Sequence, residues 1–286
     1  MYMKMVILGA KGMLGYELDK VFSNYDPILL SKDDLDITDK DRVKFKINEL
    51  KPELIINAAA YTGVDGAEEN EELATKTNGH AVGYIVEASS KINATLVHFS
   101  TDYVFDGSKK QGYTEYDKPN PINAYGRSKL AGENEILRFT PATTAGRQDD
   151  KLKYYIIRTS WLYGEHGKNF VDTMLSLSKK GELIKVVDDQ FGSPTYTIDL
   201  ALATRQIIED KRPSGIYHRT NSGITSWYDF TKEIFNAFDV KTDVAPCASN
   251  EFPRPAKRPK YSILKSTKLP EMRPWQEALQ DYKSNQ

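Results

Sequence analysis

The sequence has little cysteine: Cys247 is the only cysteine among its 286 residues. One cysteine excludes an internal disulfide and any zinc site built on paired cysteines. The four histidines are scattered along the chain without the spacing of metal ligands. We therefore predict no metal site in this protein.

The chain also lacks an excess of charge of one sign. Its 39 basic and 40 acidic residues leave a formal net charge of -1, whereas a nucleic-acid-binding domain usually carries a marked basic excess. No apolar run approaches the roughly 20 residues that span a bilayer, and the N-terminal MYMKMVILGA runs into a glycine loop without a charged leader. We expect a soluble, cytoplasmic protein that binds a small molecule and neither nucleic acid nor membrane.

Glycines are placed where a nucleotide-binding loop needs them. Residues 3–8 are predicted to form a buried strand, and GAKGMLG follows and opens a helix. In this spacing Gly9 permits a tight turn, Gly12 lets the backbone approach a pyrophosphate, and Gly15 lets the helix pack on the strand. The helix N-terminus would face the phosphates. The stretch therefore predicts dinucleotide binding.

Strands and helices alternate after this loop. We expect strands at 27–30, 54–57 and 94–99 and helices at 39–50 and 71–91. Further along, strands are expected at 184–187 and 215–218 and a helix at 197–209. This alternation is typical of a parallel sheet covered on both faces, so the predicted fold class is α/β, a Rossmann-type doubly wound sheet with a small C-terminal lobe.

The sequence predicts two domains, of which only the first shows a regular alternation of strands and helices. An NADP-binding domain is expected over 1–165, with strands also contributed from about 183–220, and 166–286 is expected to be mainly a substrate-binding lobe. The polar stretch between Phe139 and Lys153 contains glycine and proline, which indicates an exposed loop.

Two further segments permit two interpretations each. Asp36 precedes a helix, so it is either an acid near the helix N-cap or a contact for an adenine amino group, with Ile37 packing on the ring. Ala58, Ala59 and Ala60 follow a strand. Their small side chains would let a ribose and phosphates lie against the backbone, or they form only a well-packed turn.

The choice of cofactor is partly encoded after the second strand. An acidic residue there would bind the ribose 2′-hydroxyl of NAD, but this sequence has Ser31 and Lys32. Together with Lys11 they favour NADPH. Because Asp33 and Asp34 follow closely, NADH remains an alternative cofactor.

Three side chains are predicted to converge on a carbonyl. Thr101 follows an apolar strand, and Tyr125 and Lys129 lie four residues apart on a predicted helix, so they share one face. A phenol has a pKa of about 10, which a nearby cation lowers. The same spacing occurs in pairs that we expect to be mostly ordinary surface pairs: Tyr16 and Lys20, Tyr228 and Lys232, and Tyr261 and Lys265.

A set of motifs carries a family likeness over nearly the whole chain, in order: GAKGMLG, LDIT, NAAAYT, STDYVFDG, YGRSK, RTSWLYG, DQFGSPT and RPKYSIL. The sequence resembles the extended short-chain dehydrogenase/reductase family and, within it, the dTDP-4-dehydrorhamnose reductases. The pair STDYVFDG and DQFGSPT is the more specific part, since Tyr-x-x-x-Lys is shared across the superfamily.

The resemblance implies hydride transfer from NADPH to the C4 keto group of a dTDP-4-keto-6-deoxy-L-hexose. Tyr125 would donate the proton, Lys129 would lower its pKa and bind the nicotinamide ribose, and Thr101 would position the carbonyl oxygen. The sugar would be contacted by Asp102, Tyr103 and Trp161. The pyrophosphate and adenosine end would be held by Gly9, Lys11, Gly12, Met13 and Leu14. A homodimer is compatible with the resemblance.

Two other functions are compatible with the same fold and cofactor. An epimerase or dehydratase of the same fold would recycle its cofactor, so net NADPH consumption separates it from a reductase. A non-catalytic NADP-binding regulatory subunit, like the partner of a methionine adenosyltransferase, would not need the trio of Thr101, Tyr125 and Lys129. The intact trio favours an enzyme.

Overall fold

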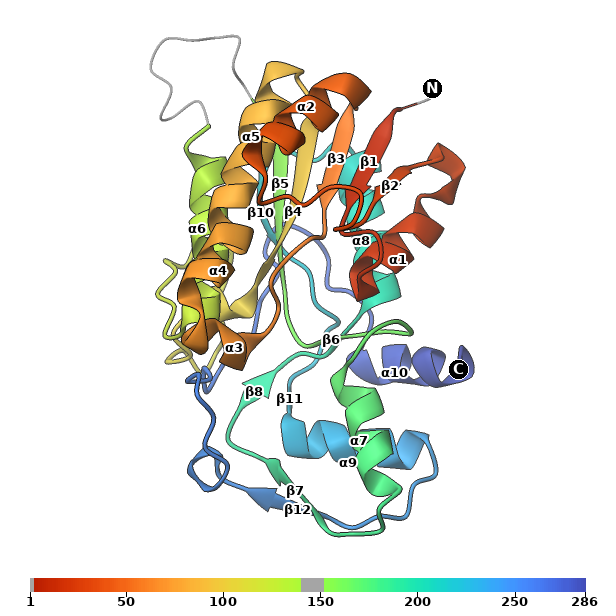
Figure 1. Cartoon of the computed structure of the whole chain (residues 1–286). Coiled ribbons are helices and arrows are strands. Elements are labelled where there is room, and N and C mark those ends of the chain that lie inside the picture. Colours follow the sequence, from red (N-terminus) through yellow and green to blue (C-terminus); the bar gives the residue numbers. More distant parts are fainter. Residues whose placement is uncertain (1–2, 140–151) are drawn as a thin grey trace.

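The computed structural model describes residues 3–139 and 152–286 (Figure 1). The polar loop predicted between Phe139 and Lys153 falls on residues 140–151, which lie outside the described part. Within the described ranges, every helix is too short or too polar to cross a membrane.

A six-stranded parallel sheet forms the centre of the larger part of the molecule. Its strand order is β10-β5-β4-β3-β1-β2, and every neighbouring pair is parallel. The strands are β1 (Met5–Leu8), β2 (Ile28–Leu30), β3 (Leu54–Asn57), β4 (Thr95–Thr101), β5 (Tyr154–Thr159) and β10 (Gly215–His218). The predicted Rossmann-type α/β fold is confirmed.

Helices cover both faces of this sheet (Figure 1). Side chains of a strand alternate between faces, so Val6 and Leu8 pack into one core cluster while Met5 and Ile7 pack into the other. The first cluster is closed by α2 (Lys40–Leu50), α5 (Ala81–Lys91) and α6 (Ala124–Leu137). The second is closed by α1 (Met13–Val21) and α8 (Thr197–Glu209).

The predicted helix over 71–91 is interrupted. It consists of α4 (Glu71–Thr75), a π-helical turn (Lys76–His80) and α5. In the π turn, the Asn78 side chain binds the backbone of Tyr61 and the Ser128 hydroxyl of α6 at 2.8–2.9 Å. A preceding helix, α3 (Val64–Glu69), was not predicted. Asn70 separates it from α4 because its side chain accepts from the Leu73 N–H at the start of α4.

A smaller lobe lies below the carboxyl ends of the strands (Figure 1). Its core joins aromatic side chains such as Tyr163, Phe230 and Tyr282. The strand predicted at 184–187 pairs with β12 outside the central sheet, whereas β10 lies in that sheet. The division into two domains stays a prediction. The lobe contains α7 (Phe170–Ser178), α9 (Trp227–Ala237), α10 (Trp275–Ser284), β7 (Ile184–Val187) and β12 (Val244–Cys247).

Candidate active site

The glycine loop joins β1 to α1 at the point where the strand order reverses. Because β2 lies on one side of β1 and β3 on the other, a crevice is expected outside their carboxyl ends. Gly9 has φ +75°, and a Cβ atom there would lie 2.6 Å from the Ala59 backbone nitrogen. Gly12 begins α1 without a side-chain cap. The first N–H groups of α1 are thus left without a side-chain partner, as a phosphate site needs.

The predicted adenosine end has paired acids. The Asp34 carboxylate accepts from the Ser31 N–H and hydroxyl at 2.9 and 2.6 Å, and Lys11 Nζ lies 3.0 Å from Asp33 Oδ2. Lys32 is exposed. The two acids that follow the second strand are therefore held by groups of the chain itself.

The structure shows that Asp36 lies near the start of α2 but does not cap that helix. Its carboxylate accepts from the Thr38 N–H and hydroxyl, both at 2.9 Å, while the N-cap of α2 is Asp39. Ile37 and Leu14 are largely buried, at 6% and 7% exposed, and belong to the two core clusters.

Small, half-buried side chains follow β3. Ala58, Ala59 and Ala60 retain part of their exposure, and the Ala58 N–H donates to the Leu8 carbonyl at 3.0 Å. The adjacent loop residue Met13 is half-buried. Ala58 and Ala59 lie next to Gly9 at the end of β1, where the pyrophosphate contact is predicted.

The predicted catalytic hydroxyls meet at the end of β4. Thr101 Oγ1 donates to Asp102 Oδ1 at 2.9 Å and accepts from the Tyr103 N–H at 3.2 Å. Asn123 caps α6 and so places Tyr125 in its first turn. The rings of Tyr103 and Tyr125 meet edge to face with centroids 5.9 Å apart, and Thr101 hydrogen-bonds the Tyr125 phenol.

The pKa values of Tyr125 and Lys129 correct one expectation. Burial and the charge of Asp102 raise the pKa of Tyr125 to about 12, whereas Lys129 was expected to lower it. Lys129 is 3% exposed and its Nζ donates to the Phe99 carbonyl at 2.7 Å. Burial lowers the pKa of Lys129 to about 8, so the ammonium is itself destabilised by its surroundings.

A buried ion pair lies beside Lys129 and was missed in the sequence. Arg158 Nε and Nη2 donate to the two Glu133 carboxylate oxygens at 2.9 and 2.6 Å, and Ser100 Oγ donates to Glu133 Oε1 at 2.5 Å. The Arg158 and Glu133 side chains are at most 1% exposed. The pair ties α6 to β4 and β5. Glu133 follows Lys129 by one helical turn. This spacing is the only feature of the sequence that indicates an acidic group beside Lys129.

A second ion pair links the C-terminal segment to α3. Arg258 Nη2 donates to Asp65 Oδ2 at 2.8 Å, and the guanidinium also hydrogen-bonds the Tyr103 phenol. Burial raises the pKa of Tyr103 above its ordinary value. Nothing in the local sequence signalled that Arg258 would reach Tyr103.

Trp161 has a strained backbone and an aromatic partner. Its φ is +49°, which is uncommon for a bulky residue. The ring stacks on Trp227 with centroids 3.4 Å apart and planes at 7°. Trp161 stays half-buried at the junction of sheet and lobe. Trp227, which the sequence did not single out, thus holds the ring of Trp161, whose contact with the sugar stays a prediction.

The comparisons with known proteins agree with this geometry. A family model described as RmlD substrate binding domain matches residues 3–286. The chain belongs to the RmlD substrate binding domain family. A dTDP-4-dehydrorhamnose reductase from Aggregatibacter actinomycetemcomitans is 40% identical over 300 residues, 98% of this chain and 98% of that one. The spore coat polysaccharide biosynthesis protein SpsK of Bacillus subtilis (strain 168) is 39% identical, covering 98% and 96%.

A solved structure of an RmlD relative has the same fold throughout. The dTDP-4-dehydrorhamnose reductase from Bacillus anthracis str. Ames, in complex with NADP, superposes with a TM-score of 0.92 at 40% identity, and each chain is covered completely. The family resemblance found in the sequence is thereby confirmed.

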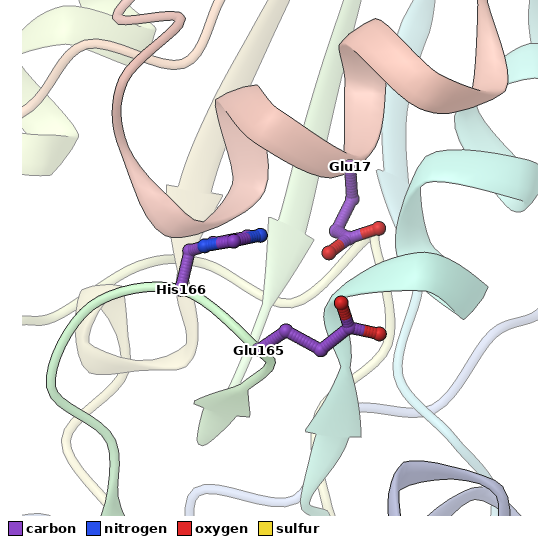
Figure 2. A group of neighbouring side chains, drawn as sticks. All are labelled: Glu17, Glu165 and His166. Carbon is purple, nitrogen blue, oxygen red and sulfur yellow. The ribbon is translucent and has the colours of Figure 1, made fainter. Parts of the chain in front are cut away.

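One group of side chains in this RmlD family member has the composition of a metal site. Glu17 of α1 faces Glu165 and His166 of the loop after β6 (Leu162–Tyr163), as Figure 2 shows, with ligand atoms within 4.8 Å of one another. Lys20 Nζ lies 3.0 Å from Glu165 and 3.6 Å from Glu17 and supplies a positive charge to the group. Burial raises the pKa of Glu17. The sequence had predicted no metal site here.

We expect Gly9→Ala to abolish tight cofactor binding in this RmlD family member. The new Cβ would collide with Ala59 and would sit on a left-handed backbone. We predict a rise of at least about 100-fold in the Kd for NADPH, measured by fluorescence titration. Gly181→Ala is the control, because Gly181 also has φ +70° but has no atom within 4 Å of the place that a Cβ would take. Equal affinities of the two variants for NADPH would contradict the role of Gly9 in the pyrophosphate site.

Proposed function

We propose that this protein is an NADPH-dependent reductase that converts the C4 keto group of dTDP-4-dehydro-L-rhamnose to the alcohol of dTDP-L-rhamnose. The observation that carries the proposal is the meeting of Thr101 and Tyr125 at the carboxyl end of β4, with Lys129 one turn further along α6. Relatives bearing the reductase name span the whole chain.

The residues present fit a dinucleotide. A Cβ at Gly9 would fill the space against Ala59, and the N-terminus of α1 has no side-chain cap. When bound, NADPH supplies the hydride. The glycine loop would hold its pyrophosphate, and Lys129 would bind the nicotinamide ribose.

The protonation state of Tyr125 suits a reduction. A phenol with a pKa of about 12 is fully protonated near neutrality, so it holds the proton that the reduced oxygen needs. Transfer leaves a buried phenolate, which the ammonium of Lys129 would stabilise from the same face of α6. In this description Lys129 acts after proton transfer and does not prepare Tyr125 beforehand.

The first test is a spectrophotometric assay of NADPH oxidation with dTDP-4-keto-6-deoxy-L-lyxo-hexose, beside its uridine analogue. Oxidation that depends on the sugar supports a reductase, and net consumption excludes an epimerase that recycles its cofactor. Tight NADPH binding without oxidation of either sugar would instead favour the regulatory subunit.

Cofactor preference gives a separate prediction. Lys11 and Lys32 are exposed at the predicted 2′-phosphate end. Replacing both by alanine should raise the KM for NADPH about tenfold, because charge-assisted bonds to the phosphate are lost, and should leave the KM for NADH within about twofold. Lys46→Ala is the control, since Lys46 pairs with Glu49 on α2 at 2.8 Å. A native preference for NADH would refute this assignment.

We also propose the cellular setting that the sequence suggests. The enzyme would act in the cytoplasm on a free dTDP-sugar, without nucleic acid or membrane, and a homodimer is the proposed assembly. The near-zero net charge supports a small-molecule partner. Sedimentation of the purified protein distinguishes monomer from dimer.

A further inference from the structure

The Asp102 carboxyl group is buried, and no cationic side chain of the described residues pairs with it. Asp102 is 3% exposed. Oδ1 accepts from the Thr101 hydroxyl at 2.9 Å, and Oδ2 is a buried oxygen without a hydrogen-bond partner among the described residues. The Ser262 hydroxyl faces the carboxyl group, where a hydrogen bond from it lowers the pKa of Asp102 and opposes the larger effect of burial, and it also lies 3.5 Å from the Phe191 carbonyl oxygen. An ionised carboxylate is costly in such a place.

The charged and titratable groups around Asp102 do not offset that cost. Tyr103 in the same turn and Tyr125 on α6 are neutral phenols whose pKa values are raised by burial. Arg258 directs its guanidinium to Asp65 and Tyr103, and Lys129 donates to the Phe99 carbonyl. Burial accordingly raises the pKa of Asp102 to about 7.

The charge state of Asp102 decides which group the Thr101 hydroxyl proton can reach. A threonine hydroxyl has one proton to donate and two lone pairs to accept with. One lone pair takes the Tyr103 N–H, the other faces the Tyr125 phenol, and the proton is committed to Asp102 Oδ1 as long as that oxygen only accepts. In this state Thr101 has no proton for the substrate's carbonyl oxygen.

We propose that Asp102 is a positioning residue that works as a neutral carboxylic acid: it donates to Thr101 Oγ1 and so frees the Thr101 proton for the substrate's carbonyl oxygen, while Tyr125 turns its own proton from Thr101 to that same oxygen. This inference rests on the proposed reductase function. Asp102 keeps its own proton throughout, and the proton that the product gains comes from Tyr125. Neutral Asp102 also removes a negative charge that opposes formation of the Tyr125 phenolate.

The pH profile of kcat tests this role. Neutral Asp102 predominates below a pH of about 7, so the rate of the native enzyme should fall as pH rises through that value. In Asp102→Asn the amide N–H₂ donates to Thr101 at every pH. We expect its rate at a pH of about 6 to lie within about fivefold of the native rate, with the decline near 7 absent. A decline unchanged from the native profile would overturn the proposal.

Asp102→Leu distinguishes positioning from simple packing. It fills the site but donates nothing, so Thr101 loses its orientation. We expect a fall in kcat of about 10- to 100-fold that does not vary between a pH of about 6 and about 7.5, with a KM for NADPH close to the native value. A leucine variant as fast as the native enzyme would show that the carboxyl group is not needed.

A measurement without turnover keeps this inference separate from the proposed function. The infrared difference between native protein and Asp102→Asn should contain the carbonyl stretch of a protonated carboxylic acid at a pH of about 6 and lose it by about 8.5. Asp106→Asn is the control, because Tyr113 and other donors hold the pKa of Asp106 well below its usual range. Turnover without the band overturns the inference. The band without turnover supports neutral Asp102 and overturns the reductase.

Discussion

Tyr125→Phe is expected to lose about 10²- to 10⁴-fold in kcat while the Kd for NADPH stays within about twofold of the native value. The substitution removes only the phenolic proton and keeps the ring, which packs edge to face on Tyr103. The size of the loss is that of removing a general acid, because Tyr125 is the group proposed to give its proton to the product oxygen. Single-turnover oxidation of NADPH measures the effect directly.

Tyr228→Phe is the matched control for this loss. Tyr228 lies four residues before Lys232 on α9, and Lys232 Nζ lies 5.0 Å from the centroid of the Tyr228 ring. The spacing and residue types therefore equal those of Tyr125 and Lys129. Its place in the lobe predicts an unchanged kcat. Equal rates for Tyr125→Phe and the native enzyme would remove Tyr125 from the mechanism.

Lys129→Met should lower both the rate and the cofactor affinity. Methionine fills a buried site of similar length, but it loses the bond to the Phe99 carbonyl and the positive charge that would face the phenolate. We expect kcat to fall about 100-fold and the Kd for NADPH to rise about tenfold, because charge-assisted bonds contribute about 1.5–3 kcal/mol. Stopped-flow kinetics and fluorescence titration separate the two effects.

The pH dependence of NADPH binding adds a check on Lys129. Its pKa of about 8 lies below the ordinary value, so the ammonium is present below that pH and is lost as pH rises through it. Binding of NADPH should therefore weaken above a pH of about 8 in the native enzyme and not in Lys129→Met. Lys232→Met serves as control. A cofactor affinity unchanged by Lys129→Met would contradict the double role of this side chain.

The local pattern of apolar and polar residues was sufficient to predict most of the strands and helices. The predicted bounds of β3, α8 and β10 coincide with those observed, because each is a run of apolar residues with one clear period and a polar or glycine boundary. The pattern failed at the π turn before α5. There Asn78 bridges Tyr61 and Ser128, which lie 17 and 50 residues away in sequence, and no local period records such contacts.

The order of elements determined where the active-site groups gather. Strands that alternate with helices must run parallel, so their carboxyl ends lie at one edge of the sheet. For that reason the sequence by itself placed the loop of Gly9, the end of β4 at Thr101 and the helix of Tyr125 in one region. It also determined the family, because the motifs appear in order along the whole chain.

Only the tertiary structure decided the charge states within that region. The pKa of Tyr125 is raised because the fold buries it beside Asp102, and Lys129 is directed to the Phe99 carbonyl. The ion pair of Glu133 and Arg158 joins residues 25 apart in the sequence. Burial and long-range pairing set the cost of a charge, and both arise from the packing of distant segments, which residue types and spacing do not specify.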